Sequence, residues 1–182
     1  MKGFVFTCFL DLVEDNFGYE IVDEIILTSN LSTGGVYTSI GTYPHYEIFE
    51  LVGQLSYVTQ IPIRTLLKLY GQHFFKVSET QYGYLLSSFT NTFQLLESIP
   101  HYMHIEVKKI YPDAELPQIT TKRVADNVLE MIYSSEQKMF DFAEGLIDSC
   151  LKFYGEEGSI EQINLNDECS KVRFLITKRN ER

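Results

Sequence analysis

Residues 101–117 read HYMHIEVKKIYPDAELP and hold two of the four histidines of this 182-residue chain. The apolar positions of the stretch recur at helical intervals, which predicts a helix from residue 101 to about Tyr111. Pro112 ends that helix, because a proline disfavours the helical conformation of the residue before it. His101 and His104 are three residues apart, so they lie on one helical face. This pattern is compatible both with core histidines and with histidines that bind a metal.

Segments in which apolar residues recur at helical spacing make up most of the chain on the N-terminal side of this stretch. They cover residues 3–14, 19–28, 45–59, 63–75 and 84–97. Gly18 gives a C-cap signal after the first helix, and residues 29–39, rich in Ser, Asn and Gly, predict a loop. Pro62 suits the first turn of the fourth helix, and Gly83 separates it from the fifth.

The pattern changes after Pro117. Alternating, β-branched segments predict strands at residues 118–124, 127–135 and 171–179, with a further strand and turn over residues 159–169. Residues 138–154 predict one amphipathic helix. We therefore expect a single α+β domain over residues 1–182, in which a helical N-terminal lobe (1–60) precedes a lobe (61–182) with a small antiparallel sheet and helices.

The composition argues against several classes of function. A formal net charge of −10 and a pI near 4.8 are unlike the basic surfaces that bind nucleic acid or anionic membranes. No apolar run approaches the ~20 residues of a membrane span, and the N-terminal stretch does not have the pattern of a signal peptide. The widely spaced Cys8, Cys150 and Cys169 fit free thiols in a reducing cytosol, so we expect a cytoplasmic location, with Cys8 in the core.

Few spacings suggest catalysis or metal binding. The cysteines have no recognisable spacing to a histidine, and Gly34-Gly35 lacks the Lys-Ser/Thr of a phosphate-binding loop. His101 and His104 have no nearby Asp, Cys or third His, so they make a weak zinc site. One axial histidine facing a wide apolar pocket is, however, the minimum for a haem site. The 13 Phe and 12 Tyr residues can line such a pocket or simply fill a core.

Several motifs occur in register along nearly the whole chain. They are the N-terminal MKG, VGQLSYVTQIPIRTLLKLYGQHFF (52–75), HIEV (104–107), YPDAELP (111–117) and YSSEQKMFDFAEGLI (133–147). With these motifs the chain resembles a stand-alone bacterial H-NOX (haem–nitric oxide/oxygen binding, HNOB) domain, a relative of the sensor domain of soluble guanylate cyclase. The resemblance implies a haem between the two lobes and a sensor that is not an enzyme.

The resemblance also implies roles around a haem b. His104 would be the axial ligand of the ferrous iron, and His101 would point elsewhere. Pro117 would press on the haem and distort it. Val5 and Leu146 would touch the porphyrin.

A Tyr-x-Ser-x-Arg motif holds the haem propionates in the family. Tyr133 and Ser135 match its first two positions, but Gln137 stands where the family has arginine. Arginine makes charge-assisted bonds to carboxylates, whereas glutamine donates neutral ones. We expect a haem attachment weakened on the order of tenfold, but not lost, unless another cation compensates.

Three aromatic residues bear on the choice of gas. Members that bind O2 stably carry a distal tyrosine, and the matching residue here is Phe142. Phe74 replaces a polar distal partner, and Phe9 matches another aromatic position of the pocket. A pocket without a donor does not stabilise bound O2, so the resemblance implies binding of NO and CO but not of O2.

The resemblance has consequences for metals and partners as well. Some relatives carry a Cys/His zinc cluster, but Phe140 occupies one ligand position and only Cys169 remains near the others, so we expect no zinc. NO binding would weaken or break the iron–His104 bond and relax the N-terminal lobe. A chain of 182 residues leaves no room for an output module, which implies a separate partner such as a histidine kinase or a cyclic-di-GMP enzyme. The alternative is a haem-less interaction module with the same fold.

Overall fold

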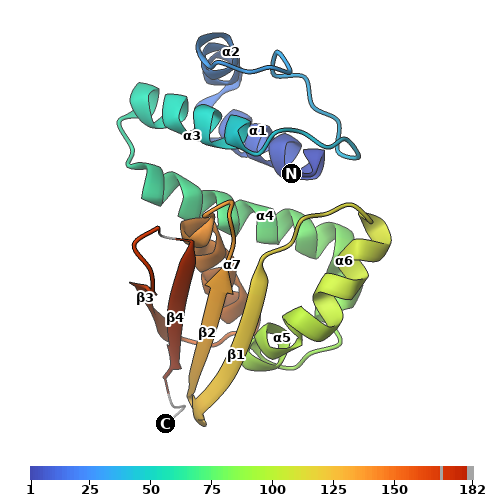
Figure 1. Ribbon diagram of the computed structural model, residues 1–182, viewed down its shortest axis with the longest axis vertical. Coiled ribbons are helices and arrows are strands. Elements are labelled where there is room, and N and C mark those ends of the chain that lie inside the picture. The colour runs from blue at the N-terminus through green and yellow to red at the C-terminus, as the bar shows by residue number, and fades with distance from the viewer. Residues whose placement is uncertain (169, 180–182) are drawn as a thin grey trace.

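The computed structural model describes residues 1–168 and 170–179 and confirms the α+β class. The N-terminal lobe contains α1 (Gly3–Phe17), α2 (Tyr19–Thr28) and α3 (Tyr46–Thr59). The long helix α4 (Ile63–Leu86) lies between this lobe and the rest of the chain (Figure 1). The other helices are α5 (Thr92–Ser98), the π-helix η1 (Ile99–Met103), α6 (His104–Ile110) and α7 (Phe140–Phe153). None of the helices of the described residues combines the length and the apolar character that a membrane span requires.

Within the described part of the chain, four strands form one antiparallel sheet in the order β1-β2-β4-β3. They are β1 (Gln118–Ala125), β2 (Val128–Ser134), β3 (Gly158–Asn164) and β4 (Lys171–Lys178). Every second residue of β2 is buried, namely Leu129, Met131 and Tyr133. These side chains share a hydrophobic cluster with residues of α7, so the period of two that predicted the strand faces this helix.

One predicted helix has the wrong bounds. α4 continues beyond residue 75 to Leu86, with a kink at Tyr82 (φ −129°, ψ 24°), beside the glycine that was expected to separate two helices. The single helix expected over residues 84–97 does not exist. The chain leaves the helical path after Leu86, and α5 begins anew where the Asn91 side chain accepts a hydrogen bond from the Gln94 N–H at 3.0 Å.

The helix expected from residue 101 to Tyr111 consists of two helices. The π-helix η1 carries Pro100 in its first turn, and α6 then starts at His104. Proline has no N–H for the regular α-helical ladder, and π turns are rare and concentrate at functional sites. Tyr111 leaves the helix (φ −128°, ψ 80°), as expected of the residue before Pro112.

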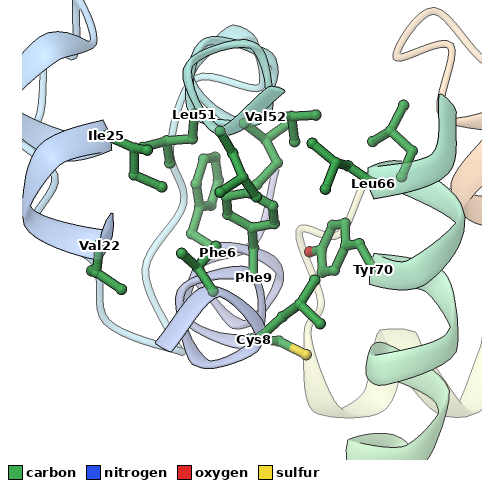
Figure 2. Close-up of a cluster of buried hydrophobic side chains, with 14 of the residues drawn as sticks. Phe6, Cys8, Phe9, Val22, Ile25, Leu51, Val52, Leu66 and Tyr70 are labelled. Atoms are coloured by element: carbon green, nitrogen blue, oxygen red, sulfur yellow. The ribbon is translucent and has the colours of Figure 1, made fainter. Parts of the chain in front are cut away.

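The first hydrophobic cluster joins the N-terminal lobe to α4 (Figure 2). Its fully buried members include Phe6, Phe9, Ile25, Leu51 and Tyr70. Cys8 belongs to the same cluster with 1% exposure, which confirms its predicted place in the core. Burial raises the pKa of its thiol to about 12, so the thiol stays protonated.

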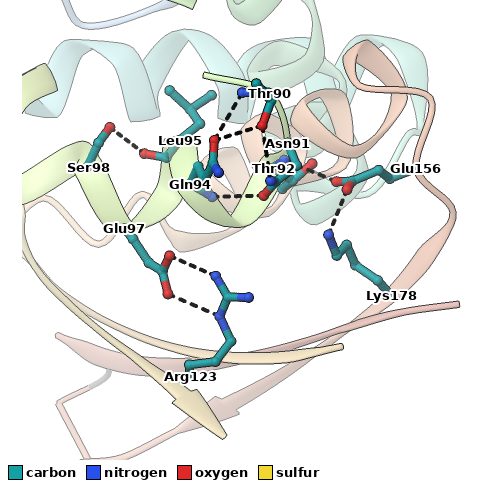
Figure 3. A network of polar contacts seen from close by, with 10 residues as sticks. All are labelled: Thr90, Asn91, Thr92, Gln94, Leu95, Glu97, Ser98, Arg123, Glu156 and Lys178. Carbon is teal, nitrogen blue, oxygen red and sulfur yellow. Dashed lines mark hydrogen bonds and ion pairs between the residues drawn. The ribbon is translucent and has the colours of Figure 1, made fainter. Parts of the chain in front are cut away.

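Polar contacts hold α5 against the sheet (Figure 3). Arg123 of β1 donates two hydrogen bonds to the Glu97 carboxylate, at 3.1 and 2.7 Å. Glu156 accepts a bond from Lys178 at 2.6 Å and another from the Thr92 N–H at 3.0 Å. Since η1 and α6 follow α5 directly, these contacts fix the point from which the histidine-bearing segment starts.

α4 and α7 approach each other closely at two glycines. A Cβ atom added at Gly71 would lie 2.1 Å from the carbonyl oxygen of Phe142, and one at Gly145 would lie 2.2 Å from that of Lys68. Both obstacles are backbone atoms, so an added methyl group would force one helix to move.

Gly145→Ala is therefore expected to lower the free energy of unfolding by about 1–3 kcal/mol, as overpacking of a core does. Urea denaturation measures this loss. The matched control is Gly53→Ala in α3, where an added Cβ meets no atom within 4 Å. The control should raise stability by roughly 0.5–1 kcal/mol, as Gly→Ala does inside helices. A Gly145→Ala protein as stable as the original would contradict the close helix contact.

Candidate functional site

A cavity of about 370 Å³ lies where the N-terminal segment, α4, α6, α7 and the first two strands meet. Its volume is in the range of small-molecule sites, roughly 300–1,000 Å³. The walls are mainly aliphatic and aromatic, including Phe4, Phe75, Met103, Val107 and Ile147. The cavity thus offers a large apolar surface between elements that are far apart in the sequence.

His104 stands on one wall of this cavity, at the first residue of α6. Burial and, to a smaller extent, the nearby Lys108 charge lower the pKa of its imidazole. Both effects favour the neutral imidazole, which is the form that binds metals. Pro117 lines the same cavity and, with His104, an outer pocket beside α6. His101 is exposed and is not among the described residues that line the cavity.

A second group of predicted residues gathers on the cavity wall as Val5, Phe74, Phe142 and Leu146. We call these four residues the apolar wall. The rings of Phe74 and Phe142 meet edge to face with their centroids 5.3 Å apart. None of the four side chains carries a hydrogen-bond donor, so this wall offers a bound molecule only apolar contact.

Phe9 requires a correction, because it does not line the cavity. It is fully buried in the first hydrophobic cluster, and its ring packs edge-on against Tyr70 at a centroid distance of 5.3 Å. The ring centroid of Tyr70 in turn lies 4.7 Å from that of Phe142. Phe9 therefore supports the apolar wall from behind. Phe4 is a further aromatic residue that lines the cavity, and the sequence did not single it out.

The three predicted propionate-binding residues occur together at the end of β2. Tyr133 lines the cavity, and burial raises the pKa of its hydroxyl to about 12, which keeps it a donor. Ser135 is not among the described residues that line the cavity, and its hydroxyl accepts a bond from the Gln137 backbone N–H at 3.1 Å and interacts with Tyr133. Gln137 lines the cavity, and its side-chain amide donates to Glu115 at 3.2 Å.

Three residues that sequence reasoning missed connect the N-terminus to the segment after α6. Lys2 Nζ lies 2.9 Å from Asp113 Oδ1 and donates to Thr42 Oγ1 at 2.9 Å, while the Thr42 hydroxyl donates to Asp113 at 2.7 Å. We call this triad the N-terminal clasp. Beside it the rings of Phe4 and Tyr111 stack with their centroids 6.3 Å apart. The MKG start of the chain was the available signal, but spacing does not reveal a partner 111 residues away.

The clasp leads to a prediction about acidity. Hydrogen bonds from Thr42 and then Lys2 lower the pKa of Asp113 to about 2 from its ordinary 3.8. Because the folded-state pKa is depressed, the contribution of the clasp to stability is complete above pH 3.8 and is lost as the pH falls through about 2. NMR titration of the carboxyl carbon should report this low pKa, and Thr42→Val should move it upwards. An unshifted value in the original protein would contradict the clasp.

Residues 1–168 and 170–179 contain no group of three or more His, Cys, Asp or Glu side chains that could hold a metal ion between them. Cys169, on which the expectation about zinc rests, lies outside the described residues. Cys150 is buried and lines the cavity, and burial raises the pKa of its thiol to about 12. His104 thus remains the candidate for binding a metal, with most of the metal's ligands supplied by another group.

The residues present fit a haem. The His104 imidazole lines the cavity, and the apolar wall forms another part of the lining. Tyr133 and Gln137 place donors among otherwise apolar walls. A flat apolar ring that carries an iron in its centre and carboxylates at its edge matches this distribution of groups.

Comparisons with known proteins identify the family of this chain. The family model described as haem-NO-binding matches residues 2–162. The H-NOX protein of K. algicida, solved as the unliganded Fe(II) form, is 42% identical over 100% of this chain and 98% of its own, with a TM-score of 0.94. The H-NOX of Shewanella woodyi, solved in the Fe(II)CO ligation state, is 37% identical over 98% of this chain and 95% of its own, with a TM-score of 0.83.

A more distant structure shows how widely the fold is shared. The H-NOX protein of S. oneidensis in the Fe(II)NO ligation state has a TM-score of 0.88 at 24% identity, and the match covers 99% of this chain and 100% of that one. The search of curated proteins found no match. The family model and two relatives above 30% identity each span most of the chain. The chain belongs to the haem-NO-binding (H-NOX) family, whose members are haem-based gas sensors.

Proposed function

We propose that this chain is a gas sensor that holds haem b, binds NO and CO at the ferrous iron, excludes O2 and acts on a separate effector protein. The observation that carries the proposal is the position of His104 on the wall of an apolar cavity between the lobes. Bound haem would supply a ferrous iron with one position for His104 and one for a diatomic gas.

The selectivity for gases rests on the apolar wall. Bound O2 carries partial negative charge and depends on a donor, whereas NO binds ferrous haem tightly without one. Val5, Phe74, Phe142 and Leu146 supply no such donor. They also supply no His, Arg or acid for proton transfer, which supports a sensor rather than an enzyme.

The residues at the end of β2 would orient the haem. Tyr133 donates through a hydroxyl that stays protonated, and Ser135 holds Tyr133 and the Gln137 backbone in place. Gln137 contributes a neutral amide in place of the family's arginine. The apolar rings and Pro117 would then determine how flat the ring can lie.

The signal would pass through α6. Release of His104 would free the start of this helix, while the far end of the helix leads through Tyr111 to Asp113, which the N-terminal clasp joins to Lys2 and Thr42. Movement of α6 is thereby coupled to the N-terminal lobe, as in a two-state element biased by one bond. A partner such as a histidine kinase or a cyclic-di-GMP enzyme would read the changed surface, and no zinc ion would be required.

Titration of the haem-free protein with haem tests the proposal. We expect a Soret band that grows to a sharp end point at one haem per chain. A titration that gives only the spectrum of free haem would contradict the sensor and favour a haem-less interaction module.

A further inference from the structure

The polar edge of the cavity contains an acid that the propionate-binding motif does not account for. Glu115 lies in the segment between α6 and β1, lines the cavity and accepts a hydrogen bond from the Gln137 side chain at 3.2 Å. The Gln137 backbone N–H is already bonded to Ser135. Glu115 therefore accepts from one N–H of the amide that replaces the family's arginine.

The charges around the cavity make this acid significant. Among the described residues that line the cavity, Lys2 and Glu115 have side chains that ordinarily carry full charge at neutral pH. The Lys2 ammonium is already held by Asp113 and Thr42 in the N-terminal clasp. Glu115 is exposed and faces a neutral amide, so no cation on this contact offsets its charge.

We propose that Glu115 limits how long the protein retains haem, an inference that rests on the proposed function. One of the two N–H groups of the Gln137 amide is bonded to Glu115, so a haem carboxylate that accepts from the other N–H lies beside a like charge. Removing that charge should slow haem loss about fivefold, the size expected of one exposed charge pair. Glu115 is thus a retention-determining residue outside the Tyr-x-Ser-x-Arg motif.

The test follows haem transfer from the holoprotein to an excess of apomyoglobin. Glu115→Gln should slow transfer about fivefold at low salt and by less at high salt, because salt screens an exposed charge. Glu136→Gln is the matched control. It removes the same charge from the exposed residue next to Gln137, which is not among the described residues that line the cavity, and it should leave the rate unchanged.

A second background separates charge repulsion from general stabilisation. In Gln137→Arg the positive guanidinium bonds both carboxylates and offsets the charge of Glu115, so adding Glu115→Gln should change the rate less than twofold. Unchanged transfer in Glu115→Gln, or equal slowing in Glu136→Gln, would overturn the role of Glu115 while a Soret band still supported the sensor. A protein without a Soret band would contradict the proposed function and this inference together.

Discussion

His104→Ala is expected to abolish stable haem binding and, with it, the Soret band of the reduced protein. His104 is the histidine that lines the cavity among the described residues, and alanine has no lone pair for the iron. Loss of a residue that merely supports a metal ligand already costs about 10–100-fold in affinity. We therefore expect a fall in haem affinity of at least about a hundredfold, measured by the same haem titration.

Two controls make this result specific. His101→Ala removes an exposed imidazole three residues away and should leave the Soret band unchanged. Added imidazole should restore the band in His104→Ala, because the free molecule can occupy the space of the lost side chain. A normal Soret band in His104→Ala without imidazole would show that another residue binds the iron.

Phe142→Tyr is expected to convert the protein into one that binds O2 in air. The ring lies on the cavity wall, 5.3 Å from that of Phe74, and a hydroxyl there would add a donor to an otherwise apolar wall. A hydrogen bond to a charged acceptor contributes about 1.5–3 kcal/mol, which corresponds to a gain in O2 affinity of roughly 10–150-fold. Stopped-flow measurement of O2 dissociation reports the change directly.

The matched control is Phe142→Leu, which alters the ring without adding a donor. This variant should bind NO and CO and still fail to form a stable O2 complex. If Phe142→Leu and Phe142→Tyr gained O2 affinity equally, the extra space and not the hydroxyl would control selectivity. If neither variant bound O2, the apolar wall would not explain the exclusion.

Periodicity predicted the N-terminal helices and the sheet well because single faces of these elements are buried. The alternation in β2 is an example, since Leu129, Met131 and Tyr133 all face the core. Periodicity failed over residues 84–97, where apolar side chains continue at helical spacing on both sides of a break. The kink at Tyr82 and the Asn91 cap determine where the helices of that region end and begin. The pattern of apolar residues carries little information about such local backbone features.

The candidate site, like the fold, could be predicted from the sequence only in part. The spacing of His101 and His104 was compatible with several chemistries, and the resemblance to a family singled out His104. It also placed Phe9 at the pocket, although the ring lies one layer deeper, behind Tyr70. The clasp at Lys2 and the acid at Glu115 depend on contacts between distant segments, and spacing along one chain carries no information about such contacts.

The proposed function depends on a ferrous haem on His104 that senses NO and excludes O2. The most direct test is the visible spectrum of the reduced haem-loaded protein, recorded first in air and then under NO without air. We predict a Soret band that shows no stable O2 complex in air and shifts on addition of NO. A stable O2 complex in air, or a Soret band unchanged by NO, would contradict the account.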